Sequence, residues 1–373
     1  MTSTALRPSS TNVDTLEVSA YTIPTDLPES DGTLEWDKTT IVIVHAKCGG
    51  VSGLGYTYAD ASTAELISGK LKDVVAGRNA MDVAGSWLAM MQSVRNVGQR
   101  GIAAMAISAV DVALWDLKAK LLRLPLVKLL GAVRAAIPVY GSGGFTSYSR
   151  EQIQKQLSGW TRSGIRMVKM KVGRKPEDDP QRVSAAREAI GPGAELFVDA
   201  NGAYSRKQAL DLAFQFRDLG VSWFEEPVSS DDLEGLRLLR NQGPPGMAIA
   251  AGEYGYYAGY FRRMLDAEAV DVLQADATRC GGVTGFLQAS ALGTAHSMQI
   301  SAHTAPAIHI HLCCAAPNAV HLEYFHDHVR IENMLFDGVR QPADGQLTPD
   351  VSRLGLGLSF ERSEAKKYQV HQA

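Results

Sequence analysis

From residue 137 onward, short segments rich in β-branched and aromatic residues alternate with longer segments of helical periodicity. The repeat is about 25 residues, and strand–helix units in series predict a parallel sheet. Eight such units favour closure into a barrel. The strand candidates are IPVYGS, RMVKMKV, ELFVDA, VSWFEE, AIAAGE, VDVLQAD, MQISAH and AVHLEY.

The chain before this repeat has a different pattern. Residues 14–23 and 40–47 read as strands, and the polar stretch 24–36 between them reads as an exposed loop. Helical periodicity follows over three segments, of which the last has apolar residues on more than one face and should be largely buried. These segments are 62–75, 80–96 and 102–123. We therefore expect an α+β domain over 1–134, a barrel over 135–334 and a segment, 335–373, that returns over the first domain.

Charged or ionisable side chains stand at the ends of nearly all predicted barrel strands. In a barrel these carboxyl ends surround one mouth, so residues distant in sequence meet in one pocket. The residues are Lys169 and Lys171, Asp199, Glu225 and Glu226, Glu253, Asp276, His303 and Glu323.

Three of these residues, Asp199, Glu225 and Glu253, lie on adjacent predicted strands. Carboxylates gathered in one site raise one another's pKa values, and a hard divalent cation relieves this repulsion. Taken singly, each acid could equally be solvated or paired with a lysine. Together they predict a magnesium site.

Basic groups flank the acids. Lys169 and Lys171 are two residues apart and share one side of an otherwise apolar strand, so each should lower the pKa of the other and make a lysine usable as a general base. His303 could act from the opposite side, with Asp276 binding one ring nitrogen. Glu323 would need a raised pKa to donate a hydrogen bond beside a substrate carboxylate.

Other histidines close by in the chain have no partner at a strand end. We expect them to be structural or surface residues; they are His309, His311, His321, His326 and His328.

The motifs KMKVG, FVDANG, FEEP, GE at 252–253, LQAD and SAH at 301–303, with the helix AISAVDVALWDLKAK, resemble the markers of the mandelate racemase subgroup of the enolase superfamily. The resemblance covers roughly residues 14–360, and no marker is missing. It implies a modified TIM barrel, of (β/α)8 type, with an N-terminal α+β capping domain completed by the C-terminal segment. It also implies that 24–36 is a mobile lid and that the protein is a homo-oligomer, often an octamer.

The resemblance further implies roles for the site residues. Asp199, Glu225 and Glu253 would bind Mg²⁺, and Lys171 would be the base on one face of the substrate carbon. Lys169 would assist and touch the carboxylate, and the His303–Asp276 dyad would serve the other face. Glu323 would hydrogen-bond the substrate carboxylate, and Asn201 would lie near the substrate.

The reaction expected from this set is removal of the proton alpha to a carboxylate, through an enolate. Dehydration of an acid sugar to a 2-keto-3-deoxy acid is preferred, because a polar lid suits a polyhydroxylated substrate. The polar lid residues are Asp26, Glu29, Ser30, Asp31 and Thr33. Racemisation or epimerisation of a 2-hydroxy acid and lactone cycloisomerisation remain open, as does a metal-binding protein without turnover.

Composition excludes other classes. A formal net charge of −3 over 373 residues gives no electrostatic footprint for nucleic acid or an anionic membrane. Residues 1–18 lack the pattern of a signal peptide, and no apolar run approaches a membrane span. Four irregularly spaced cysteines fit a reducing compartment. The sequence thus predicts a cytoplasmic enzyme that acts on a small carboxylic acid.

Overall fold

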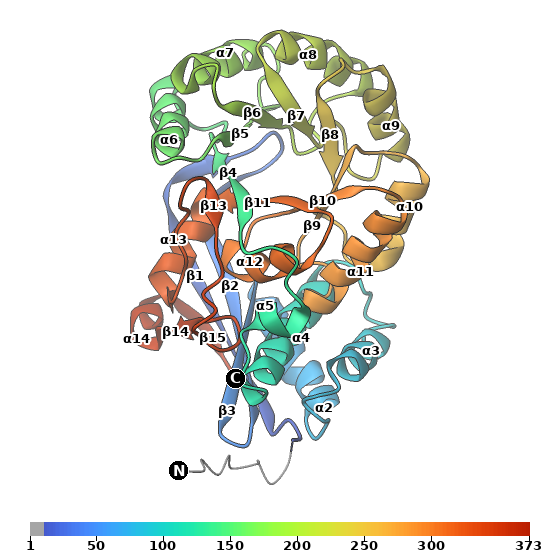
Figure 1. Cartoon of the computed structure of the whole chain (residues 1–373), viewed down its shortest axis with the longest axis vertical. Helices are drawn as coiled ribbons and strands as arrows, with labels where there is room; N and C mark the ends of the chain where they lie inside the picture. Colours follow the sequence, from blue (N-terminus) through green and yellow to red (C-terminus); the bar gives the residue numbers. More distant parts are fainter. Residues whose placement is uncertain (1–10) are drawn as a thin grey trace.

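The computed structural model describes residues 11–373 and shows a barrel beside a smaller α+β domain (Figure 1). The prediction that residues 1–18 are not a signal peptide falls largely on residues outside this range. Within residues 11–373, no helix has the length and apolar character needed to cross a bilayer.

A four-stranded sheet forms the framework of the smaller, capping domain, with strand order β15-β1-β2-β3. Strands β1, β2 and β3 are antiparallel neighbours, and the edge strand β15 comes from the far end of the chain. The bounds are β1 (Thr15–Ser30), β2 (Glu35–Cys48), β3 (Val51–Tyr58) and β15 (Gln369–Gln372).

The expectation that 24–36 is an exposed loop is wrong. Strand β1 continues to Ser30 and β2 begins at Glu35, so that after an irregularity between Pro24 and Glu29 the pairing resumes at Glu29 opposite Trp36. The segment is a β-ribbon with a short turn at its tip. Pairing on both sides of the irregularity satisfies backbone groups that the prolines had led us to place in a loop.

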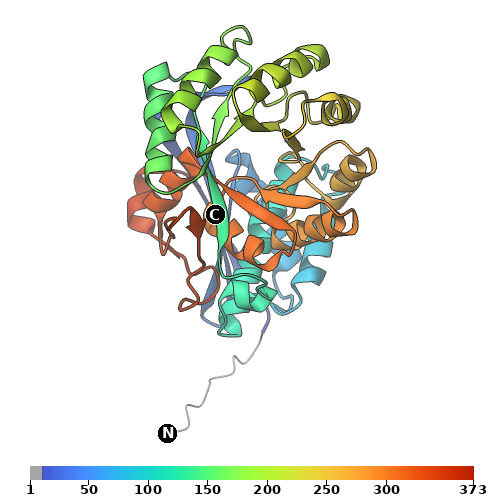
Figure 2. The ribbon, with the colours of Figure 1, turned by 45° about the horizontal axis from the view of Figure 1, so that its top comes forward.

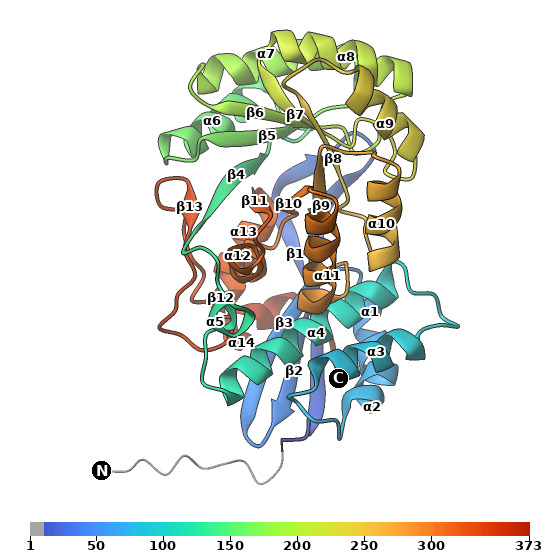
Figure 3. The same ribbon diagram turned by 45° about the vertical axis from the view of Figure 1, so that its right-hand side comes forward.

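The helices of the capping domain cover one face of its sheet. They are α1 (Ser62–Leu66), the π-helical turn η1 (Ile67–Leu71), α2 (Lys72–Val75), α3 (Val83–Ser93), α4 (Ile102–Leu121) and α5 (Leu126–Leu130). The expected burial of α4 is confirmed, with 14 of its residues buried. It packs between β3 and the barrel helix α11 (Gly282–Ala295) (Figure 3).

A glycine permits this packing. A Cβ atom at Gly55 of β3 would lie 2.2 Å from the carbonyl oxygen of Ala109 and 2.5 Å from the amide nitrogen of Ala113, both in α4. Real Cβ contacts are never this short, so the helix reaches the sheet only because this position has no side chain.

Eight parallel strands form the barrel in the described part of the chain, and pairing of the last with the first closes it. They are β4 (Ile137–Gly143), β5 (Met167–Lys171), β6 (Glu195–Asp199), β7 (Val221–Glu225), β8 (Ala248–Ala251), β9 (Val272–Ala275), β10 (Gln299–Ala302) and β11 (Ala319–Phe325). Each matches one predicted strand. The modified TIM barrel is therefore confirmed.

Helices surround the barrel strands (Figure 2). In chain order they are α6 (Arg150–Arg162), α7 (Asp179–Ile190), α8 (Arg206–Asp218), α9 (Leu233–Gln242), α10 (Ala258–Asp266), α11, α12 (Pro306–Ala315) and α13 (His326–Leu335). The core lies between this layer and the strands, and inside the barrel Tyr140, Phe197 and Trp223 form a smaller aromatic cluster.

The C-terminal segment connects the two domains. Its elements are β12 (Phe336–Asp337), β13 (Gln346–Leu347), β14 (Ser359–Phe360), α14 (Arg362–Ala365), the 3-10 turn η2 (Lys366–Tyr368) and β15. Strand β13 pairs with β4 of the barrel, and β15 pairs antiparallel with β1 of the capping sheet. The segment thus completes the capping sheet, although the domain limits at 134 and 335 stay predictions.

Candidate active site

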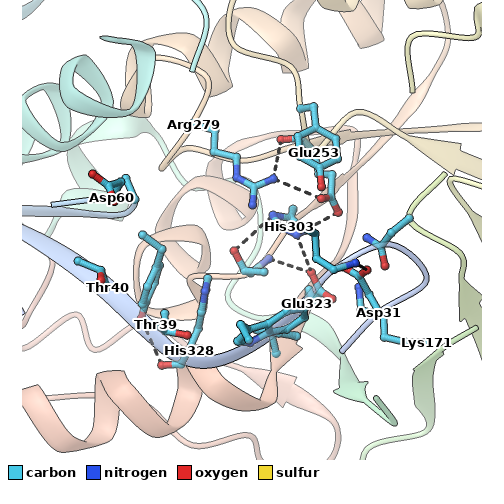
Figure 4. Close-up of a pocket in the computed structure, with 18 of the residues that line it drawn as sticks. Asp31, Thr39, Thr40, Asp60, Lys171, Glu253, Arg279, His303, Glu323 and His328 are labelled. Atoms are coloured by element: carbon cyan, nitrogen blue, oxygen red, sulfur yellow. Dashed lines mark hydrogen bonds and ion pairs between the residues drawn. The ribbon is translucent and has the colours of Figure 1, made fainter. Parts of the chain in front are cut away.

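A cavity of about 430 Å³ lies at the carboxyl ends of the barrel strands, beneath the capping domain (Figure 4). Barrel residues such as Lys171, Glu253 and His303 form one part of its wall. The capping domain supplies Thr40 and Asp60, which Figure 4 shows across the cavity from Lys171. The pocket is therefore built from both domains.

The three acids predicted to bind a metal come together. Asp199 ends β6, Glu225 ends β7, and Glu253 follows β8 by two residues. One oxygen from each lies within 4.8 Å of the others, and all three side chains are buried. Burial, followed by the charge of Asp199, raises the pKa of Glu225 to about 8.

This donor set fits a hard divalent cation. Three buried carboxylates supply only oxygen ligands, which Mg²⁺ prefers, and their mutual repulsion is what a cation would remove. Glu226, the neighbour of Glu225, is also buried, and burial and the charge of Glu253 raise its pKa well above the usual value. Two carboxyls of this cluster, those of Glu225 and Glu226, are therefore held toward the protonated form by burial and by neighbouring acids.

Both predicted lysines reach these acids from β5. The Nζ atom of Lys171 lies 2.5 Å from Asp199 Oδ2. Lys169 forms an ion pair with Glu225, and its Nζ atom lies 2.8 Å from Glu323 Oε1 and 3.4 Å from Asp199 Oδ2. The pair thus stands among three carboxylates, those of Asp199, Glu225 and Glu323.

The expected lowering of the lysine pKa values is not found in this arrangement. Burial favours neutral lysines, but the adjacent carboxylates outweigh it, and the pKa of Lys171 is raised, chiefly by Asp199. The pKa of Lys169 is raised too, first by Glu225 and then by Glu323. The sequence showed the repulsion between the two lysines, but it did not show the carboxylates that contact them.

His303 and Asp276 form the expected dyad. Nδ1 of His303 donates to Oδ2 of Asp276 over 2.8 Å, and Nε2 lies 3.1 Å from Glu253 Oε2. Burial opposes protonation of the ring, but the charge of Glu253 overcomes it and raises the pKa of His303 to about 10. Burial also acts to raise the pKa of Asp276. The hydrogen bond and the charge of His303 outweigh burial, so this pKa is lowered.

The loop after β9 fixes this dyad. Oδ1 of Asp276 accepts hydrogen bonds of 2.7 Å from both the amide and the hydroxyl of Thr278. Buried His309 accepts from the amide of Ala277 over 2.8 Å and donates to the carbonyl of Thr304 over 2.7 Å. His309 therefore has a structural place behind the dyad.

Glu323, on β11, closes the set from the other side. Its Oε2 accepts from the amide of Thr304 over 3.1 Å and lies 3.7 Å from Nε2 of His303. The expected raised pKa is wrong for this arrangement: burial acts upward, but the charges of Lys169 and His303 lower the pKa of Glu323 to about 2. The sequence did not reveal that Lys169 lies in direct contact.

Lys171 and His303 occupy opposite ends of the row of acids. Lys171 contacts Asp199, the first acid, and His303 contacts Glu253, the third. Their strands β5 and β10 enclose β6 to β9 in the strand order of the barrel. A molecule seated over the acids would thus meet one basic group from each side.

Asn201 lies beside this row with a strained backbone, at φ +46°. Its amide donates to Asp199 Oδ1 over 2.9 Å, and its side chain lines the cavity. The Oδ1 atom is buried and has no hydrogen-bond partner among the described residues. It is therefore free to accept a hydrogen bond from a bound molecule.

The tip of the β1–β2 ribbon is docked on the barrel. A Cβ atom at Gly32 would lie 2.4 Å from the carbonyl oxygen of Ala200 and 2.9 Å from that of Val172. The hydroxyl of Thr146 donates to the carbonyl of Asp31 over 2.8 Å. The ribbon thus lies against the barrel and supplies Asp31, Leu34 and Trp36 to the cavity wall.

The expectation that the polar ribbon residues face the substrate needs correction. Of the five, only Asp31 lines the cavity, and its Oδ1 is engaged by the amides of Thr33 and Leu34 at 2.6 and 2.7 Å. Asp26 pairs with His326, and Glu29 accepts from Trp36. The cavity wall here also includes the apolar side chains of Leu34 and Trp36.

Several cavity residues escaped the sequence analysis. Arg279 lies 3.3 Å from Glu253 Oε1 and 3.6 Å from Asp276 Oδ2, over the ring of Tyr254. Its position three residues after Asp276 was a usable signal. The cavity residues of the capping domain had no such signal in the sequence, because their placement depends on how the two domains dock. They are Lys38, Thr39, Thr40, Tyr58 and Asp60.

His328 is also a cavity residue, although we expected a structural or surface histidine. Its ring stacks on Tyr58 with centroids 3.4 Å apart and an interplanar angle of 12°. Burial holds its pKa well below the usual value, so it is a neutral wall of the pocket.

Comparison with family models matches both parts of the chain. Residues 16–131 match the N-terminal domain of mandelate racemase/muconate lactonizing enzyme, and residues 152–365 match an enolase C-terminal domain-like model.

Relatives along nearly the whole length include a dehydratase and a cycloisomerase. L-talarate/galactarate dehydratase of Salmonella typhimurium is 30% identical, with 96% of this chain and 91% of that protein covered. The 3,6-anhydro-alpha-L-galactonate cycloisomerase of Streptomyces coelicolor is 31% identical, with 91% and 94% covered.

Solved structures agree with the fold. A mandelate racemase/muconate lactonizing enzyme-like protein from Rubrobacter xylanophilus has 56% identity and a TM-score of 0.94, with 96% of this chain and all of that chain covered. A racemase from Streptomyces coelicolor with bound magnesium has 28% identity and a TM-score of 0.90, with the same coverage.

Proposed function

The chain belongs to the mandelate racemase/muconate lactonizing enzyme family of the enolase superfamily, and from this we propose that it dehydrates an acid sugar to a 2-keto-3-deoxy acid. The observation that carries the proposal is the placement of Lys171 and His303 at opposite ends of three buried carboxylates. Dehydration needs a base for the α-proton and an acid for the leaving hydroxyl, and these two groups supply them.

We propose that Asp199, Glu225 and Glu253 hold Mg²⁺, as their all-oxygen donor set favours. When bound, the cation would stabilise negative charge on the substrate carboxylate. Lys169 would bind the same carboxylate, because its charged ammonium group is buried beside Asp199 and Glu225. Glu323 would position Lys169 and the Thr304 amide.

Lys171 would take the α-proton from one face. As a base it must be neutral, which requires that Asp199 be engaged elsewhere than with its ammonium group. His303, protonated in the arrangement described here, would deliver a proton from the other face to the departing β-hydroxyl. Asp276 would hold the ring at Nδ1 and direct Nε2 into the cavity.

The far wall supports a polyhydroxylated substrate. Asp60 offers a carboxylate and Lys38 a positive charge, and the hydroxyls of Thr39 and Thr40, which bond Asp327 and Thr22, can each accept a further hydrogen bond. Asn201 Oδ1 is available as an acceptor nearer the acids. Hydroxyl groups of a sugar chain would satisfy these polar atoms better than an aromatic ring.

Cycloisomerisation of a sugar lactone is the second candidate, and the cycloisomerase relative favours it. In that reaction His303 or Lys171 would donate a proton to the lactone ring oxygen as it leaves. Racemisation or epimerisation of a 2-hydroxy acid would require the two groups to exchange a proton across the same carbon. A homo-oligomeric assembly, with an octamer as one form, stays a prediction.

A library of mono- and diacid sugars and their lactones tests the proposal. The protein is incubated with each compound and Mg²⁺, and 2-keto acid formation is measured beside ring opening and α-deuteration in D₂O. A 2-keto acid product that is absent with Lys171→Ala and with His303→Asn supports dehydration. Ring opening alone, or deuteration with inversion alone, would assign the second or third reaction instead.

A further inference from the structure

A second group of potential metal ligands lies outside the row of acids, where the β1–β2 ribbon meets the barrel. Asp26 and Glu29 are on β1, and His326 is the first residue of α13. One ligand atom from each lies within 4.8 Å of the others. His326 Nε2 is 3.0 Å from Asp26 Oδ2. Residues 300 positions apart thus bring two carboxylates and an imidazole together.

Glu29 is the unusual member of this group. Its side chain is 0% exposed, and Oε2 accepts from Trp36 Nε1 over 2.9 Å. Its Oε1 atom is buried and has no hydrogen-bond partner among residues 11–373. A buried carboxylate oxygen without a donor is costly, and a bound cation would satisfy it.

The neighbouring charges do not compensate. Asp327, next in the chain to His326, adds a third carboxylate to this region. Arg330 is the nearby cation, but it donates to Asp327 Oδ1 and to the carbonyl of Pro24. No ion pair between Glu29 and a basic residue is found in the described part of the chain. Burial and the charges of Asp327 and Asp26 raise the pKa of Glu29 to about 9 against the charge of Arg330, so without a cation this carboxyl is protonated at neutral pH.

We propose that Asp26, Glu29 and His326 form a second cation site, for a borderline divalent ion such as Zn²⁺. An imidazole nitrogen beside two carboxylates suits such an ion better than Mg²⁺, which prefers oxygen ligands alone. Asp26 and His326 are partly exposed, so solvent can reach the site and complete the coordination. The inference does not depend on the proposed function.

The site would tie the ribbon to the barrel. Asp26 and Glu29 lie on the strand that leads to the docked tip at Gly32, and His326 follows β11, the strand of Glu323. A cation shared by the three would hold the ribbon against the barrel rim. Hydrogen bonds that need no cation also hold the ribbon there, from Ser147 to the carbonyl of Pro28 and from Arg330 to the carbonyl of Pro24.

Zinc stoichiometry tests the proposal, once the row of acids is disabled by Asp199→Asn with Glu253→Gln. The full chain carrying this pair of substitutions is stripped with a chelator, equilibrated with Zn²⁺ and analysed for metal per chain by mass spectrometry. We expect one zinc. Adding His326→Gln or Asp26→Asn should weaken zinc binding at least about tenfold.

A matched control is His371→Gln, because His371 pairs with Glu65 over 3.1 Å at a different surface position. This change should leave the zinc count at one. Circular dichroism verifies folding of each variant, and Asp26, a half-exposed side chain, gives a variant with little risk to the fold.

Hydrogen exchange gives an independent readout. In the same Asp199→Asn, Glu253→Gln background, Zn²⁺ should slow amide exchange over 24–36, and His326→Gln should abolish this slowing. Absence of bound zinc, or zinc binding that neither His326→Gln nor Asp26→Asn weakens, overturns the proposal.

Discussion

His303 Nδ1 lies 2.8 Å from Asp276 Oδ2, and this contact directs the opposite ring nitrogen toward the acids. We expect Asp276→Asn to lower kcat about a hundredfold or more with little change in KM, because an amide can select the wrong tautomer of the ring. Steady-state kinetics over a range of pH would show that one limb of the plot of kcat against pH is shifted relative to wild type. Asp271→Asn is the control and should keep wild-type kcat and KM, because Asp271 stands at the amino end of β9, where it pairs with Arg240 and the amide of Ile249.

Separate loss of the two basic groups distinguishes the two faces of the substrate carbon. Lys171→Ala and His303→Asn should each reduce turnover by about 10²–10⁴-fold, the range for removal of a general acid or base. In D₂O, His303→Asn should still exchange the α-proton through Lys171, whereas Lys171→Ala should not. Full activity in either variant on the identified substrate would contradict the assigned roles.

Mg²⁺ should stabilise the chelated protein against unfolding. Binding to the folded state alone adds about 3 kcal/mol at a hundred times the dissociation constant. Differential scanning fluorimetry with increasing Mg²⁺ would follow this as a rising Tm. The rise should vanish when Asp199→Asn is combined with Glu253→Gln; an undiminished rise there would place the ion elsewhere.

Gly55→Ala should destabilise the contact of β3 with α4. The added Cβ would meet the carbonyl of Ala109 at 2.2 Å, so helix and sheet must separate. Overpacking of this kind costs about 1–3 kcal/mol, measurable by urea unfolding. Gly85→Ala in α3 is the matched control: nothing lies within 4 Å of its Cβ, and it should be neutral or stabilising.

Glu332 should make stability depend on pH. Burial raises its pKa from 4.5 to about 8, against the hydrogen bonds from Tyr56 and the amide of Ala307. The folded state therefore binds a proton that the unfolded state releases, so its contribution is fully present below pH 4.5 and is lost as pH rises through 8.

Glu332→Gln should remove this dependence, because the amide stays neutral. Relative to wild type, the variant should gain stability between pH 5 and 8, by on the order of a few kcal/mol. Urea unfolding at several pH values measures the gain. The exposed Glu364→Gln should give parallel curves to wild type, and a Glu332→Gln curve parallel to wild type would refute the raised pKa.

The barrel strands and their terminal side chains were predictable because both signals are local. β-Branched runs such as that before Asp199 define a strand, and the carboxyl end of a parallel strand has one position in a barrel. The ribbon was not predictable in the same way. Pro24 and Pro28 suggested a loop, and the pairing of Glu29 with Trp36 depends on contacts across the turn.

The charge state of the site was the other limit. The spacing of Lys169 and Lys171 shows that they share a side of β5. It does not show that Lys169 forms ion pairs with Glu225 and Glu323. The pKa of a buried group follows its nearest charges, which only the packed structure supplies.

The pairing of β15 with β1 has a consequence for the order of events during biosynthesis. Strand β1 leaves the ribosome early, but its partner at Gln369–Gln372 is translated some 350 residues later. Until then, β1 has one unpaired edge in the nascent chain, and such edges recruit other strands. Protection of that edge by a chaperone, or by another nascent segment, would therefore influence the yield of native protein more than the stability of the finished fold.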